Sequence, residues 1–240
     1  MKAHERHRLK EDPIVRHTTR VLGSLTEHRD RWIKGGVLAA AAIVLVSAVV
    51  LWLQHERDAG GGPLGVAMAI EQAPIAPAPT LPGATQTSGT YPTEQARSEA
   101  ALKAFEAIAS TYGTSPVGLT ARYHVALAQM NLGRLTEAQQ TFEQLSASAG
   151  SSIYGPMARM GRAEALAEQS KYDDAIKAFT DLSGERDSVL PVDGVLMQLA
   201  KTCAKAGKKQ EAKAAYKRVV EEFPDSPFLQ EATQQMALLG

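Results

Sequence analysis

The stretch "LAKTCAKAGKKQEAKAAYKRVVEEFPDSP", residues 199–227, contains two helical patterns separated by a short turn with a glycine. In the second pattern, Ala212, Tyr216 and Val219 follow one another at intervals of four and three residues. This spacing places the three side chains on one face of an α-helix. Because the turn is short, the helix before it must fold back against that face. The stretch therefore predicts a helix hairpin, with a small alanine where the two backbones approach closely.

The same three residue types recur with a period of 37 residues through residues 94–240. The recurring residues are Ala101, Ala138, Ala175 and Ala212, then Phe105, Phe142, Phe179 and Tyr216, and then Ile108, Leu145, Leu182 and Val219. A first helix before each turn is indicated by Val125 with Ala126, and again by Leu199 with Ala200. One hairpin cannot bury its apolar face alone, so the pattern predicts an all-α solenoid of stacked hairpins.

These repeats resemble the tetratricopeptide repeat, whose second helix carries an alanine, then an aromatic residue and then an alanine or aliphatic residue. Residues 199–227 match this pattern closely, and "ALAQMNLGRLTEAQQTFEQL", residues 126–145, matches it well. The middle repeat departs at Arg162, where an apolar residue is expected. The resemblance implies a TPR-like repeat domain over residues 94–240, with connections longer than those of a 34-residue repeat.

The two ends of this domain differ from the repeats between them. Residues 227–239 align with a first helix, which indicates a cap. The second helix at 94–112 lacks a preceding partner, and a short apolar stretch at residues 64–72 is a candidate for it. That stretch lies in residues 54–93, a segment rich in glycine and proline that predicts a linker with one short helix.

Residues 35–53, "GGVLAAAAIVLVSAVVLWL", contain no charged residue. As a helix they would span roughly 28 Å, the thickness of a bilayer core, and so predict a transmembrane helix. Trp32 and Trp52 would lie at its two interfaces. Basic residues are concentrated before this segment, so we expect a cytoplasmic N-terminus and a repeat domain outside the membrane. The alternative is a cleaved signal peptide.

Residues 1–34 form a basic preface in which Lys and Arg outnumber Asp and Glu. An apolar stripe that includes Ile14, Val21 and Leu25 indicates an amphipathic helix, which would lie on the inner membrane surface or dock on a partner. A solvated basic tail is the alternative.

Composition and motifs argue against an enzyme. Lys and Arg equal Asp and Glu at 26 each, so net charge does not point to nucleic acid. The single cysteine, Cys203, excludes an internal disulfide, and His124, expected on a helix surface, has no partner for a metal site. Nucleophile-elbow, phosphate-loop and zinc-protease motifs are absent from the sequence. We therefore predict no catalytic residues, no cofactor and no metal.

The resemblance implies a protein-binding groove built from the first helix of each hairpin. Its residues would be Tyr123, Leu127, Met130, Asn131, Met157, Met160, Glu164, Glu168, Met197, Lys201 and Lys205. Methionine is flexible and suits varied apolar partners, although the same methionines could simply fill contacts between hairpins. A basic stripe on the last hairpin, from Lys201 to Arg218, could meet an acidic partner or anionic headgroups. The alternative is a solvated face, because acidic residues are interleaved with the basic ones.

The order of the parts resembles bacterial membrane-anchored repeat proteins, a group that includes the ancillary subunit of the Sec translocon. This resemblance implies a single-pass protein of the bacterial inner membrane. Its repeat domain would bind translocon subunits, exported chains or periplasmic chaperones. A structural adaptor in envelope or cell-division assembly is an alternative, and a regulatory or enzymatic role that acts through the cytoplasmic preface is another.

Overall fold

The computed structural model describes residues 43–47, 62–77, 85–185 and 189–239. The chain divides into two compact units, residues 1–56 and 57–240. In the first unit residues 43–47 are described, and they are helical. The predicted amphipathic helix and most of the predicted membrane segment therefore lie outside the described residues. In the described part of the chain, no helix combines the length and apolar character needed to cross a membrane.

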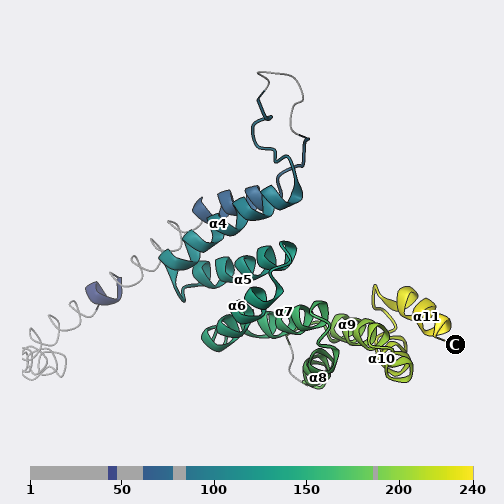
Figure 1. The fold of residues 1–240 in the computed structure, drawn as a ribbon. Helices are drawn as coiled ribbons and strands as arrows, with labels where there is room; N and C mark the ends of the chain where they lie inside the picture. Colours follow the sequence, from purple (N-terminus) through teal and green to yellow (C-terminus); the bar gives the residue numbers. More distant parts are fainter. Residues whose placement is uncertain (1–42, 48–61, 78–84, 186–188, 240) are drawn as a thin grey trace, which may run out of the picture. The chain divides into compact units, whose positions relative to one another are not determined.

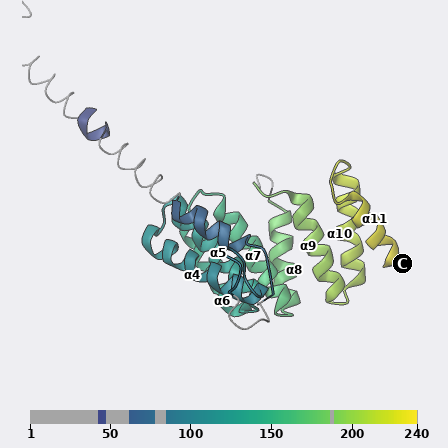
Figure 2. The same ribbon diagram turned by 90° about the horizontal axis from the view of Figure 1, so that it is seen from above.

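The second unit is built from helices that pack in chain order, as Figures 1 and 2 show. After a helix at residues 62–71 come α4 (Glu94–Tyr112), α5 (Pro116–Asn131), α6 (Leu135–Ser148), α7 (Tyr154–Glu168), α8 (Tyr172–Ser183), α9 (Val192–Lys205), α10 (Lys209–Glu222) and α11 (Leu229–Leu238). From α4 onward each of these helices contacts the next, and the first helices also contact one another, α5 with α7 and α7 with α9. This arrangement confirms the predicted all-α solenoid of stacked hairpins.

Every residue at the three recurring positions is buried. The aromatic residues Phe105, Phe142, Phe179 and Tyr216 are between 0 and 2% exposed. Burial of such a side chain contributes about 1.5–3 kcal/mol of hydrophobic free energy, which makes these rings the main anchors of each hairpin. The period in the sequence is therefore the period of the core.

The helix at residues 62–71 packs on the N-terminal end of the repeats. Ala67 is fully buried in a cluster with residues of α4 and α5. The segment that follows is tied to α4, because the Arg97 guanidinium donates a hydrogen bond to the Ala73 carbonyl oxygen at 3.2 Å. An isolated parallel bridge between Ile75 and Tyr91 brings the two ends of the proline-rich segment together. Residues 62–71 thus supply the partner that α4 lacks in the 37-residue pattern.

The turn between the two helices of each hairpin has the same geometry in three repeats. Gly133, Ser170 and Gly207 lie 37 residues apart and have φ angles of 71°, 61° and 75°. At each turn the next backbone N–H donates back into the preceding helix, as from Lys171 to the Leu166 carbonyl oxygen at 2.9 Å. Glycine adopts this left-handed conformation at no steric cost, whereas a serine is strained there.

Substitution of Ser170 by glycine should therefore stabilise the protein. We expect Ser170→Gly to raise the free energy of unfolding by up to about 1 kcal/mol, because it removes left-handed strain. The matched control is Gly207→Ser, which introduces the same strain one repeat later and should lower the free energy of unfolding. Urea denaturation of both variants measures the two changes. A loss of stability in Ser170→Gly would contradict the strain argument.

Arg162 departs from the repeat pattern at a position where the neighbouring repeats bury Val125 and Leu199. It is half-buried on α7. In the described part of the chain, its Nε is the one buried side-chain nitrogen or oxygen atom without a hydrogen-bond partner. An arginine can cover apolar surface with its stem while its charged end reaches water, which lets this position keep the hairpin fold.

Gly161 lets α6 and α7 approach closely. A Cβ atom at this position would overlap the ring of Phe142, with Cε1 at 2.6 Å and Cζ nearer still. Phe142 is itself fully buried, so its ring could move aside only by displacing its neighbours in the core. One repeat earlier the same position is His124, whose ring stacks on Phe105 with centroids 4.7 Å apart. The residue that faces the buried aromatic ring therefore differs in size from one repeat to the next.

Gly161→Ala should lower the free energy of unfolding by about 1–2 kcal/mol, because overpacking outweighs the gain in helix propensity. Gly194→Ala is the matched control, since the nearest atom to its added Cβ would be Phe228 Cε2 at 3.8 Å. That variant should be as stable as the wild type or slightly more stable. Urea unfolding of the pair checks the prediction, and equal stabilities would show that the two helices can separate without cost.

Candidate protein-binding surface

The predicted groove residues lie on α5, α7 and α9, the three first helices that contact one another in turn. The structure therefore places side chains from three repeats on neighbouring helices. Ten of the eleven predicted residues retain some exposure, and this set is called the first-helix surface. Its members are Tyr123, Leu127, Met130, Asn131, Met157, Met160, Glu164, Glu168, Lys201 and Lys205.

Met197 is the exception. It is 2% exposed and belongs to the largest core cluster, so it fills a contact between hairpins. Met157 and Met160 pack against the same cluster but remain partly exposed. Of the predicted methionines on α7 and α9, therefore, the two on α7 can contact a partner without rearrangement of the core.

The α5 part of the first-helix surface is aromatic and apolar. Tyr123, Leu127 and Met130 are partly buried and pack against the cluster that contains Phe142. The Tyr123 ring has its centroid 5.9 Å from that of Tyr154 on α7. The hydroxyl groups of Tyr154 and Thr120 are hydrogen-bonded at 2.7 Å, which holds the Tyr154 ring in place. These contacts place a tyrosine ring of α5 beside a tyrosine ring of α7.

Three of the four charged residues on this surface are ion-paired. Lys205 Nζ lies 2.8 Å from Glu168 Oε1 on the preceding first helix, and this hydrogen bond raises the pKa of Lys205. Lys201 Nζ lies 2.9 Å from Glu231 Oε1 on α11. Glu164 differs, because none of the described residues donates a hydrogen bond to it or forms an ion pair with it. Its half-buried carboxyl group is the charged feature of the surface that lacks a partner among the described residues.

The environment of Glu164 disfavours its charged form. Burial raises the pKa of this carboxyl group, and the nearby negative charge of Glu168 raises it further. Burial also raises the pKa of the Tyr123 hydroxyl, and the negative charge of Glu164 is the next cause. The two side chains are thus close enough to act on each other electrostatically.

Glu164→Gln should stabilise the free protein at neutral pH. The folded-state pKa lies above the unfolded value of about 4.3, so holding Glu164 charged at pH 7 costs the folded state free energy. As the pH falls through the folded pKa, the carboxyl group is protonated and this cost is lost. We expect a gain of about 0.5 kcal/mol at neutral pH, and none once the pH is below the unfolded pKa of about 4.3. Urea unfolding at both pH values measures it.

The control for this measurement is Glu143→Gln, which neutralises an exposed residue of α6. Its free energy of unfolding should match that of the wild type at both pH values. A destabilised Glu164→Gln variant at neutral pH would show that the charged carboxylate stabilises the free protein, which is contrary to the packing around it.

The basic stripe of the last hairpin is matched by acidic neighbours. Lys208 Nζ lies 2.8 Å from Asp173 Oδ1 on α8, and Arg218 Nε lies 2.7 Å from Glu222 Oε1 on the same helix. Lys217 Nζ lies 3.5 Å from Glu221 Oε1. These pairs support the interpretation of the stripe as a solvated face.

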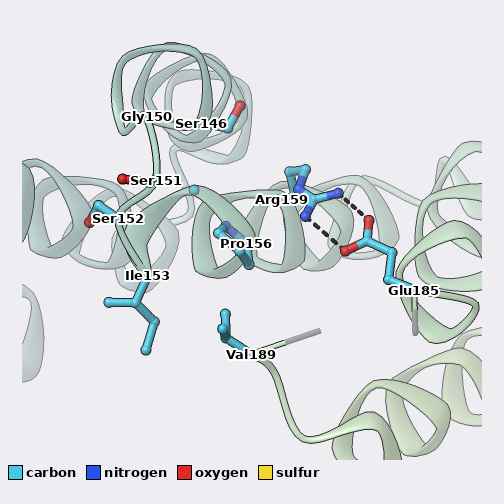
Figure 3. Close-up of a pocket in the computed structure, with 10 residues that line it drawn as sticks. Ser146, Gly150, Ser151, Ser152, Ile153, Pro156, Arg159, Glu185 and Val189 are labelled. Carbon is cyan, nitrogen blue, oxygen red and sulfur yellow. Dashed lines mark hydrogen bonds and ion pairs between the residues drawn. The ribbon is translucent and has the colours of Figure 1, made fainter. Parts of the chain in front are cut away.

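The structure also contains a hollow that sequence reasoning missed. It has a volume of about 550 Å³ and is shown in Figure 3. Its walls come from the end of α6, the connection between α6 and α7, the start of α7, and Glu185 and Val189 of the α8–α9 connection. Arg159 Nη2 donates a hydrogen bond to Glu185 Oε2 at 3.0 Å. Ile153 and Val189 are 53% and 61% exposed. The sequence signal for this hollow is the period of 37 residues, because a period longer than 34 predicts extended connections between the repeats.

His124 lies deeper than the predicted surface position. Its ring stacks on Phe105, and its Nδ1 lies 2.9 Å from Glu71 Oε2 in the helix at residues 62–71. The side chain is 20% exposed. His124 therefore joins the N-terminal helix to α5. In the described ranges, no group of three His, Cys, Asp or Glu side chains could hold a metal ion.

Comparisons with known proteins agree with this geometry. Family models described as tetratricopeptide repeat match residues 94–152, 126–188 and 195–226. A search of the curated proteins gave no match.

Solved structures that are similar to this chain include proteins with TPR-like repeats. Two crystal structures of Podosopora anserina putative kinesin light chain nearly identical TPR-like repeats, one of them a point variant, are 16% identical with a TM-score of 0.52. The match covers 60% of this chain and 77% of theirs. A thermophilic TPR protein in Thermus thermophilus is 18% identical with a TM-score of 0.33, covering 59% of this chain and 91% of that one.

Proposed function

The chain belongs to the tetratricopeptide repeat proteins, which generally act as non-catalytic scaffolds for protein partners, and we propose that it is a protein-binding adaptor anchored in the bacterial inner membrane. The anchor is the uncharged segment at residues 35–53. The repeat domain lies outside the cytoplasm, because the basic residues precede that segment.

The observation that carries the binding role is the first-helix surface. It brings aromatic, methionine and charged side chains from α5, α7 and α9 onto neighbouring helices. Tyrosine and methionine are enriched in protein interfaces, where they give a large contact area that adapts to varied partners. Partly exposed Tyr123, Met130 and Met160 are therefore suited to bind a segment of another protein.

The proposed partners are translocon subunits, exported chains or periplasmic chaperones. What supports this choice is the order of the parts, with a basic preface, one membrane segment and an outward repeat domain. A structural adaptor in envelope or cell-division assembly would use the same surface to bind a single fixed partner. The two roles differ in how many different proteins contact the surface.

Site-specific photocrosslinking in cells tests the proposal. A probe in place of Met160 should capture translocon subunits or many exported chains, because Met160 is a partly exposed member of the first-helix surface. A control probe in place of Lys209, an exposed residue at the start of α10, should capture little. The adducts should remain in the membrane pellet after alkaline extraction, since residues 35–53 anchor the chain.

Other outcomes assign different roles. Capture of one envelope protein from Met160 would favour the structural adaptor. Capture from Lys209 alone would show that partners bind elsewhere on the repeats. Adducts released by alkaline extraction would contradict the membrane anchor.

A further inference from the structure

Glu164 is unusual on the first-helix surface because the other three charged residues of that surface are ion-paired. Glu168 pairs with Lys205, and Lys201 pairs with Glu231. Lys201 lies one repeat after Glu164, so it is the nearest cation in the repeat pattern, but it is engaged with α11. Among the described residues nothing donates to the Glu164 carboxylate.

The carboxylate is nevertheless open to an incoming group. In the described part of the chain, Arg162 Nε is the one buried side-chain nitrogen or oxygen without a hydrogen-bond partner. The carboxylate oxygens of Glu164 and the hydroxyl oxygen of Tyr123, which also lacks a described hydrogen-bond partner, are therefore not sealed in the core. Both groups reach solvent from a half-buried position, so a ligand can contact them without rearrangement of the core.

The neighbours of Glu164 on the first-helix surface include an aromatic residue, Tyr123. Tyr123 on α5 corresponds, one repeat earlier, to Met160, which lies one helical turn before Glu164 on α7, and α5 and α7 are in contact. Tyr123 is close enough to experience the charge of Glu164. A carboxylate with a tyrosine ring nearby is an environment that suits a guanidinium or ammonium group. A carboxylate forms charge-assisted hydrogen bonds with such a cation, and the face of an aromatic ring attracts the cation.

We propose that Glu164, with Tyr123 beside it, holds the Arg or Lys side chain of a protein segment bound on the first-helix surface. The inference rests on the proposed protein-binding function and specifies the chemistry of the partner. Leu127 and Met160, on the same surface, contact apolar side chains of the segment on either side of the cation. The partner segment therefore carries a basic residue among apolar ones.

The test is a double-mutant cycle on the full-length protein in detergent micelles. The probes are two fluorescein-labelled capped peptides with the sequence Ser-Leu-Met-X-Leu-Ser, in which X is arginine or its neutral isostere citrulline. Wild-type protein should bind the arginine peptide about tenfold more tightly than the citrulline peptide in fluorescence anisotropy titrations. Glu164→Gln should bind the two peptides equally, with the whole loss falling on the arginine peptide.

The control variant is Glu143→Gln, which removes one negative charge from α6 and should keep the preference for arginine. This control distinguishes a direct contact between Glu164 and the arginine of the peptide from a general effect of the protein's net charge. Glu164→Gln is expected to be at least as stable as the wild type, so a loss of binding would not be explained by unfolding, and circular dichroism of both variants verifies this.

Equal binding of the two peptides to the wild-type protein would overturn the inference, while the protein-binding function would stand if a Met160 probe still captured partners. A preference for arginine that survives Glu164→Gln would also overturn it, because the cation would then bind elsewhere. Absence of binding by either peptide would overturn it too, and the crosslinking experiment would decide the proposed function independently.

Discussion

Burial of an aromatic ring between successive first helices organises the whole solenoid. Phe142 shows this most clearly, because its ring lies 5.8 Å from the Tyr123 ring on α5 and packs against Gly161 on α7. The ring cannot be shielded from water by its own hairpin alone. Stacking of the next hairpin completes the burial, and it also brings α5 and α7 together as neighbours.

The first-helix surface is a consequence of this stacking. Once successive first helices are in contact, side chains 37 residues apart meet, as Glu168 and Lys205 do. Glu164 falls in this row between Leu127 of α5 and Lys201 of α9, and Lys201 is paired with Glu231. The charged form of Glu164 costs free energy in the isolated protein, a cost that natural proteins commonly retain where a residue serves binding rather than stability.

The helix at residues 62–71 covers the N-terminal end of the repeats. A terminal second helix would expose the face that includes Phe105, and Ala67 covers part of it. The contact between His124 and Glu71 then fixes this helix to α5 as well as to α4. The packed array therefore includes the helix at residues 62–71, which lies in the segment expected to be a linker with one short helix.

The hairpins, their period and the residues of the core could be predicted from the sequence, because these features depend on spacings of three and four residues within single helices. The glycine turns at Gly133 and Gly207 were visible there too. Tertiary packing was needed to show that Met197 is buried while Met160 is partly exposed, and that Glu164 has no partner among the described residues. Each of these outcomes depends on how closely helices from different repeats approach. That distance is set by pairs of side chains on different helices, such as Gly161 and the fully buried Phe142, whose sizes no local periodicity encodes.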